Sequence, residues 1–260
     1  MTPATERLDV AAVAAHPDDL EITCGGTLAK LVRQGYRVGI LDLTDGEPTP
    51  RGTPELRTKE AEAARQTLGV QLRVQVGLTN RILMDSPENR FILATWLRRL
   101  RPSILLGTAG RTPAASPDHF QAQLLIEAAR FYSQLTKWDD RFAGTPPYRV
   151  PHLVYAPFPF DAEVRHWPGS FIIDVSDTME QKLKAIGCYQ SQFDEPRFER
   201  MRHFVSGHNT AIGGRCGFAY GEMFHLPAPV GGSDLHALVL GAKGSPAPVA
   251  LPGQPPPPMG

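Results

Sequence analysis

The chain has few cysteines, no surplus of charge of either sign and no long hydrophobic run. Its cysteines, Cys24, Cys188 and Cys216, lie far apart and form no CxxC pair. This spacing argues against a disulfide framework or a thiolate zinc site and fits a reducing compartment. The 27 lysines and arginines equal the 27 aspartates and glutamates, so no long-range field favours nucleic acid or an anionic membrane. The expected partner is therefore a small molecule.

The N-terminal segment lacks the features of an export signal. Its apolar run, Val10 to Ala15, is no longer than a strand, and no basic region followed by a long apolar region occurs. We therefore expect a cytoplasmic protein that neither spans nor binds a membrane. The sequence leaves the oligomeric state open, a homo-oligomer included.

Strand-like and helix-like segments alternate along the first half of the chain. Apolar runs typical of strands cover residues 8–15, 37–43, 72–76 and 103–107, and helical patterns cover 21–34, 54–68, 87–100 and 118–132. Such alternation predicts βαβ units. The expected fold is α/β, with a Rossmann-like, mostly parallel sheet and helices on both faces.

The C-terminal part is more irregular. We expect strands over 150–156 and 171–175, then helices over 177–192 and 197–208. From Leu226 to Gly260 the chain holds nine prolines and six glycines but only two charged side chains, which cannot build a core. The sequence therefore predicts one domain over residues 1–226 and a flexible tail rich in proline and glycine over residues 227–260.

The segment His16-Pro17-Asp18-Asp19-Leu20-Glu21 places a histidine beside carboxylates where an apolar strand gives way to a helix. The carboxyl ends of strands in an open α/β sheet are where ligands bind. The structural alternative is that Asp18 or Asp19 caps the following helix. A cap needs one such residue and does not explain the adjacent histidine.

A second segment, Ser116-Pro117-Asp118-His119, also follows an apolar strand and begins a helix. If the first and fourth strands are neighbours, both segments face one crevice at the point where the strand order reverses. Catalytic zinc sites use three imidazole or carboxylate ligands and leave a position for water. Two histidines and one aspartate would satisfy that count.

A known family shares this ordered series of motifs. AHPDDLE, GGTLAKLVRQGY, LDLTDGE, TPELRTKEAEAA and PDH resemble the LmbE-like (PIG-L) family of zinc-dependent N-acetylglucosaminide deacetylases. Two later segments, IIDVSDTMEQKLKAIGCYQSQF and FAYGEMF, resemble the branch of that family in bacillithiol biosynthesis. The resemblance covers about residues 8 to 226 and implies a hydrolase that acts on an amino-sugar substrate.

The resemblance also implies roles for single residues. It makes His16, Asp19 and His119 the ligands of Zn²⁺, although Fe²⁺ and cobalt also suit such a set. It makes Asp18 the general base that activates water. Arg57 and Glu47 match positions that bind the sugar or its aglycone. The alternative for Arg57 is a helical i,i+3 pair with Glu60, which would contribute a few tenths of a kcal/mol.

Two positions depart from the family pattern. Ser116 replaces a histidine that is thought to stabilise the oxyanion or protonate the leaving amine. Asn80, within Thr79-Asn80-Arg81-Ile82, stands where the family carries an aspartate before Arg81. Asp118 keeps its place, and His208 is a candidate for the lost imidazole, against the alternative of a surface or core histidine.

The expected reaction is deacetylation of N-acetylglucosaminyl-malate. Two alternatives stay open. One is another N-acetylglucosaminide, such as a chitobiose-like sugar or a secondary-metabolite glycoside. The other is a weakly active protein that binds zinc or sugar, because of Ser116 and Asn80.

Overall fold

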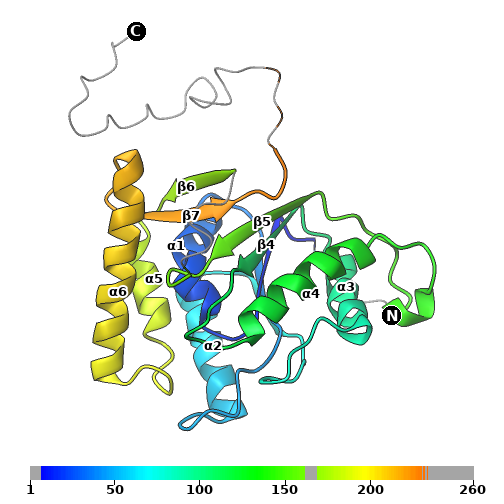
Figure 1. The fold of residues 1–260 in the computed structure, drawn as a ribbon, viewed down its shortest axis with the longest axis horizontal. Coiled ribbons are helices and arrows are strands. Elements are labelled where there is room, and N and C mark those ends of the chain that lie inside the picture. The colour runs from blue at the N-terminus through cyan, green and yellow to red at the C-terminus, as the bar shows by residue number, and fades with distance from the viewer. Residues whose placement is uncertain (1–6, 162–168, 230, 232, 234–260) are drawn as a thin grey trace.

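The computed structural model describes residues 7–161, 169–229, 231 and 233. The described chain builds one seven-stranded sheet in the order β3-β2-β1-β4-β5-β7-β6. Figure 1 labels β4, β5, β6 and β7 of this sheet. The first five strands in this order are parallel, and β7 is antiparallel to both β5 and β6. The predicted α/β fold with a mostly parallel sheet is confirmed.

The elements alternate as the sequence predicts. The strands are β1 (Val10–Ala14), β2 (Val38–Asp42), β3 (Leu72–Gln75), β4 (Ile104–Ala109), β5 (His152–Pro157), β6 (Ser170–Asp174) and β7 (Gly221–His225). The α-helices are α1 (Asp19–Arg33), α2 (Pro54–Leu68), α3 (Pro87–Leu100), α4 (Asp118–Tyr132), α5 (Met179–Ile186) and α6 (Glu195–Gly213). None of the helices in the described residues is long and apolar enough to cross a membrane.

Strand β1 is the middle one of the five parallel strands and is buried on both faces. Its side chains alternate between two hydrophobic clusters, as the period of two in a strand requires. Ala11 and Val13 pack in the cluster that contains residues of α3 and α4. Val10, Ala12 and Ala14 pack in the cluster that contains residues of α1, α2 and α5. Helices therefore cover both faces of the sheet, as Figure 1 also shows.

Strands β1 and β4 are neighbours, with Val10 opposite Ile104 and Val13 opposite Gly107. The chain moves outward on one side through β2 and β3 and returns through β4 to the other side. The strand order thus reverses between β1 and β4. The region outside their carboxyl ends, called the β1/β4 crevice below, is where ligands bind in open sheets of this kind. Because β1 and β4 are neighbours, the segments that contain His16 and His119 lie at the same edge of the sheet, as predicted.

The C-terminal elements differ from those predicted from the sequence. The helix expected over 177–192 is wrong in its extent, because α5 ends at Ile186. The chain turns at Gly187, where a Cβ atom would lie 3.1 Å from the ring of Phe198, and Tyr189 enters the core. Helix α6 runs well past the expected 197–208, and β7 was not predicted. Most of the tail predicted over 227–260 lies outside the described residues.

Helix α1 depends on a carboxylate from the far end of the chain. The helix is kinked at Cys24, and Glu222 of β7 binds the backbone N–H groups just beyond the kink. Its two oxygens accept from Gly26 at 3.0 Å and from Thr27 at 2.7 Å, and the buried Lys182 ammonium donates to it at 2.6 Å. Gly26 is required there, because a Cβ atom would lie 2.9 Å from that of Val175.

Replacing Glu222 by glutamine should lower the free energy of unfolding by about 3–5 kcal/mol, since Lys182 would remain buried without a counter-charge. Urea denaturation monitored by circular dichroism would measure the change. Glu199→Gln is the matched control, because Glu199 pairs with Arg202 at the surface and should cost less than about 1 kcal/mol. Equal stability of the two variants would contradict a structural role for this buried pair.

Candidate metal centre

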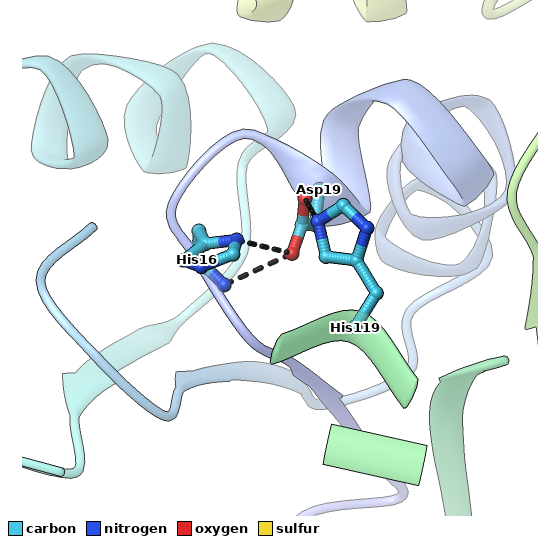
Figure 2. Close-up of side chains that lie close together, drawn as sticks. All are labelled: His16, Asp19 and His119. Carbon is cyan, nitrogen blue, oxygen red and sulfur yellow. Dashed lines mark hydrogen bonds and ion pairs between the residues drawn. The ribbon is translucent and has the colours of Figure 1, made fainter. Parts of the chain in front are cut away.

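Three side chains that the sequence singles out meet at the β1/β4 crevice. His16 follows β1, Asp19 begins α1 and His119 lies in the first turn of α4. One ligand atom from each lies within 4.8 Å of the others. Figure 2 shows both imidazole rings beside the Asp19 carboxylate. Asp19 and His119 are buried and His16 is half-buried, so the three groups meet largely away from solvent.

The backbone at Asp18 places these residues. Asp18 has φ 102°, a left-handed conformation that costs a residue other than glycine about 1–3 kcal/mol. Asp18 occupies the N-cap position of α1, but its side chain makes no capping hydrogen bond, so capping does not account for this carboxylate. The Asp19 carboxylate instead accepts from the backbone N–H of His16 at 2.9 Å. The strained turn thus aims consecutive carboxylates in different directions.

The hydrogen bonds of His119 fix which nitrogen is free. Its Nδ1 lies 2.8 Å from the Thr112 hydroxyl, and that hydroxyl donates to the carbonyl of Ser116 at 3.1 Å. A hydroxyl has a single proton, so Thr112 accepts from Nδ1–H. The Nε2 lone pair of His119 then faces Asp19 Oδ1 at 3.4 Å. Such an outer partner is typical of metal-binding histidines.

His16 has a carboxylate on each side of its ring. Nδ1 lies 3.4 Å from Asp19 Oδ2, and Nε2 lies 3.4 Å from Asp118 Oδ2. Burial lowers the pKa of His16, but the negative charge of Asp19 and the hydrogen bond to Asp118 outweigh it and raise the pKa to about 10. The site therefore favours a positive charge where the three ligands meet.

The same charges act on the carboxyl groups. Burial raises the pKa of Asp19, but the neighbouring His119 and His16 reverse this and hold it well below its usual range. Burial also raises the pKa of Asp18, to about 7, against the opposing charge of Arg57. Asp19 is thus suited to bind a cation, and Asp18 is suited to exchange a proton.

These residues fit a divalent metal by the chemistry of their donors. Two imidazoles and one carboxylate, with no thiolate, form a set typical of catalytic zinc. Asp118 and Thr112 each hold one histidine by the nitrogen that faces away from the cluster. The structure shows no other group of three or more such ligands within the described residues.

Arg57 faces this centre from α2. Its Nη2 donates to the carbonyl of Pro17 at 2.7 Å, and its Nη1 lies 3.6 Å from Asp18 Oδ2. Its Nε lies 3.9 Å from Glu47, and neither Nε nor Nη1 has a hydrogen-bond partner. Glu60 binds Ser191 instead, so the helical pair between Arg57 and Glu60 is not formed.

Glu47 organises the loop that borders the site. Its carboxylate accepts from the backbone N–H of Thr49 at 2.5 Å and from the Thr49 hydroxyl at 2.9 Å. A Cβ atom on Gly52 would lie 2.0 Å from Glu47 Oε1, so a larger residue there would displace the Glu47 carboxylate. Glu47 is buried, and its expected contact with a sugar stays a prediction.

Known proteins share this architecture. The model of the PIG-L family, described as GlcNAc-PI de-N-acetylase, matches residues 11–130. A diacetylchitobiose deacetylase from Thermococcus kodakarensis is 30% identical over 86% of this chain and 88% of its own length. The chain belongs to the PIG-L family. A solved structure of a conserved protein from Thermus thermophilus is 36% identical, with a TM-score of 0.74 over 86% of this chain and 97% of that one.

The PIG-L relatives do not all carry the name of a deacetylase. A 4-oxalmesaconate hydratase from Pseudomonas putida is 27% identical over 69% of this chain and 72% of its own length. Family membership alone therefore does not determine the reaction, which depends on the residues of the site itself.

The two departures from the PIG-L pattern both lie next to the centre. The Ser116 hydroxyl accepts from the backbone N–H of Asp118 at 3.3 Å, at the start of α4. Arg81, beside Asn80, donates its backbone N–H to Asp118 Oδ2 at 2.8 Å. Asn80 is buried, and its Oδ1 has no hydrogen-bond partner. Ser116 therefore supports the helix, while Asn80 keeps an acceptor available.

His208 is half-buried on α6 and does not belong to the cluster of ligands. One turn earlier on α6, the ring of Phe204 lies 6.5 Å from that of Phe160, which lies 6.5 Å from His119. The helix thus passes on the His119 side of the crevice. That His208 replaces the lost imidazole stays a prediction.

Sequence reasoning missed several residues of this site in the PIG-L chain. Thr112 gave no signal, because a threonine in a loop has no characteristic spacing. Phe158 follows β5 and stacks on His119 at 4.2 Å, which likewise no motif indicates. Arg73 was detectable, since a charged side chain inside a strand demands a partner. It binds Asp42 and Glu21 in the interior.

Replacing Thr112 by valine should weaken divalent-metal binding about 10–100-fold, the usual effect of removing an outer partner of a ligand. His119→Ala should abolish stoichiometric binding. Titration of metal-free protein against a competing chelator would measure both. Thr95→Val is the control, because its hydroxyl is also buried but bonds within α3. Unchanged affinity in Thr112→Val would contradict the role given to that hydroxyl.

Proposed function

We propose that the chain is a zinc-dependent hydrolase that removes the N-acetyl group from a glucosamine-derived small molecule. The observation that carries this proposal is the meeting of His16, Asp19 and His119 at the β1/β4 crevice, with Asp18 beside them. Membership of the PIG-L family supports the same reaction, and so does the name of the Thermococcus relative.

His16, Asp19 and His119 would hold the metal. When bound, a divalent cation supplies a Lewis acid that polarises the amide carbonyl and makes a water molecule more acidic. Zinc is proposed because of the mixed imidazole and carboxylate donors. Fe²⁺ is the alternative for the same donors.

Asp18 would accept the proton of the attacking water. Its neighbour Asp19 would help to hold the metal, and Asp18 would then serve as the base for a water molecule bound there. Burial favours the neutral form of Asp18, and Arg57 at 3.6 Å favours the charged form. A carboxyl group held between these two influences can take a proton and later release it to the leaving amine.

The substrate is proposed from the resemblance of the later motifs. N-acetylglucosaminyl-malate, a precursor of bacillithiol, is the leading candidate. N,N'-diacetylchitobiose is the alternative within the same reaction, supported by the Thermococcus relative. A feeble enzyme that mainly binds zinc or sugar is the second candidate function, since Ser116 supplies no cationic donor to the developing oxyanion.

Asp18→Asn should retain the metal and lose turnover by about 10²–10⁴-fold, because the amide keeps the shape of the side chain but takes no proton. Release of acetate by metal-replete protein would measure turnover, and metal content would be measured on the same sample. Asp9→Asn is the control, since Asp9 pairs with Arg37 away from the crevice. Near-normal turnover in Asp18→Asn would assign the base to another group.

A panel of N-acetylglucosaminides would test the function itself. We expect zinc-loaded wild type to release acetate from N-acetylglucosaminyl-malate faster than from N,N'-diacetylchitobiose or N-acetylglucosamine. Faster release from diacetylchitobiose would favour the alternative substrate. Binding of the sugars without release of acetate from any of them would show that the chain is a binding protein.

A further inference from the structure

An open pocket lies at the N-terminal end of α6, beside the loop that joins α5 and α6. Its volume is about 380 Å³, within the usual range for small-molecule sites, and it is lined by Gln192, Phe193, Arg197, Arg200, Met201 and Phe204. The four lining residues on α6 follow the i, i+3, i+4, i+7 spacing of one helix face. In Figure 1 this helix flanks the sheet beside α5.

Both walls of this pocket, called the α6 pocket below, are linked through neighbouring side chains to the metal centre or its border. On one side, the Gln192 amide donates to the Thr49 hydroxyl at 3.3 Å, and Thr49 binds Glu47. On the other side, the rings of Phe204, Phe160 and His119 follow one another at 6.5 Å between successive centroids. The α6 pocket therefore adjoins the crevice in which the acetylated sugar would be cleaved.

The α6 pocket combines apolar rings with uncompensated positive charge. Asp194 is one carboxylate shared by two arginines, Arg51 and Arg197. Arg200 lines the pocket and has no ion pair or hydrogen bond with any other residue that the structure describes. Glu195, the next carboxylate along the chain, makes no ion pair with any described residue, and Glu199 is taken by Arg202 at 2.6 Å.

We propose that the α6 pocket binds an anionic group, a carboxylate or a phosphate, on the aglycone of the substrate. This inference rests on the proposed function, because it takes the N-acetyl sugar to lie at the metal centre. Arginine presents a planar fork of donors that matches both anions. Phe193, Met201 and Phe204 would cover the apolar carbons that connect the anion to the sugar.

The position of Arg200 gives it the role of a specificity residue. Arg197 already shares Asp194, so an incoming anion gains most from Arg200. Because this guanidinium is exposed and hydrated, its contribution to binding falls at the lower end of the range for charged hydrogen bonds. Loss of such a contact corresponds to about a tenfold change in affinity.

The test compares one anionic and one neutral substrate in the zinc-loaded full chain. Arg200→Gln should lower the ratio of kcat/KM for N-acetylglucosaminyl-malate to that for N,N'-diacetylchitobiose about tenfold, through KM. Arg200→Lys keeps the charge and should recover most of the ratio. Arg202→Gln, on the same helix but outside the pocket, should leave the ratio unchanged. An unchanged ratio in Arg200→Gln, or an equal fall in Arg202→Gln, would overturn the proposal.

Two further arms separate the sources of failure. If wild type hydrolyses none of these sugars, the proposed function fails. Calorimetry would then measure the binding of N-acetylglucosaminyl-malate and test whether the α6 pocket binds the anion. Weaker binding to Arg200→Gln than to wild type supports the α6 pocket, and equal binding overturns it. The same test with N-acetylglucosaminyl-phosphoinositol in place of N-acetylglucosaminyl-malate examines phosphate as the anion. The anionic substrate whose kcat/KM, relative to that for N,N'-diacetylchitobiose, falls more in Arg200→Gln carries the preferred anion.

Discussion

The crevice between β1 and β4 collects more negative charge than the side chains around it can balance, and much of the molecule is arranged to tolerate this. The carboxylates are Asp18, Asp19, Glu21, Asp42, Glu47 and Asp118, and the arginines among them are Arg57 and Arg73. The ring of Tyr189 lies 5.4 Å from one guanidinium and 5.9 Å from the other, and its hydroxyl donates to Glu21. A divalent cation would reduce the remaining imbalance at the point where His16, Asp19 and His119 converge.

Most of the parallel half of the fold could be predicted because local rules and tertiary packing agree there. Helix α2 has the predicted bounds, since Thr53 accepts from the backbone N–H of Leu56 and Gly69 ends the helix with a positive φ. Strand β1 is buried on both faces, which matches its uninterrupted apolar run. The end of α5 could not be predicted, because it is set by the close approach of Phe198 to Gly187. That contact joins separate elements, and no local pattern encodes it.

The residues of the candidate site likewise divide into those that a local motif indicates and those that only the fold brings there. The three candidate ligands and Asp18 stand in short motifs at strand ends, where chemistry and topology coincide, so the sequence indicated them. Thr112 and Phe158 contact His119 from loops whose course depends on the whole sheet. Ser116 looked like a lost catalytic group, and the structure adds that its hydroxyl now supports the start of α4. Such substitutions can be found from the sequence, but their new contacts require coordinates.

The clamp that Glu222 forms on α1 ties the order of synthesis to the assembly of the site. Gly26 and Thr27 are separated from Glu222 by 196 and 195 positions along the chain, so a ribosome releases their partner only after nearly all of the domain has been made. Until then, the backbone N–H groups of Gly26 and Thr27 lack their acceptor. The part of α1 that follows the first turn, where Asp19 lies, is not yet held by Glu222. Contacts of such long range slow folding. The candidate metal site would therefore be completed late, after β7 has joined the sheet.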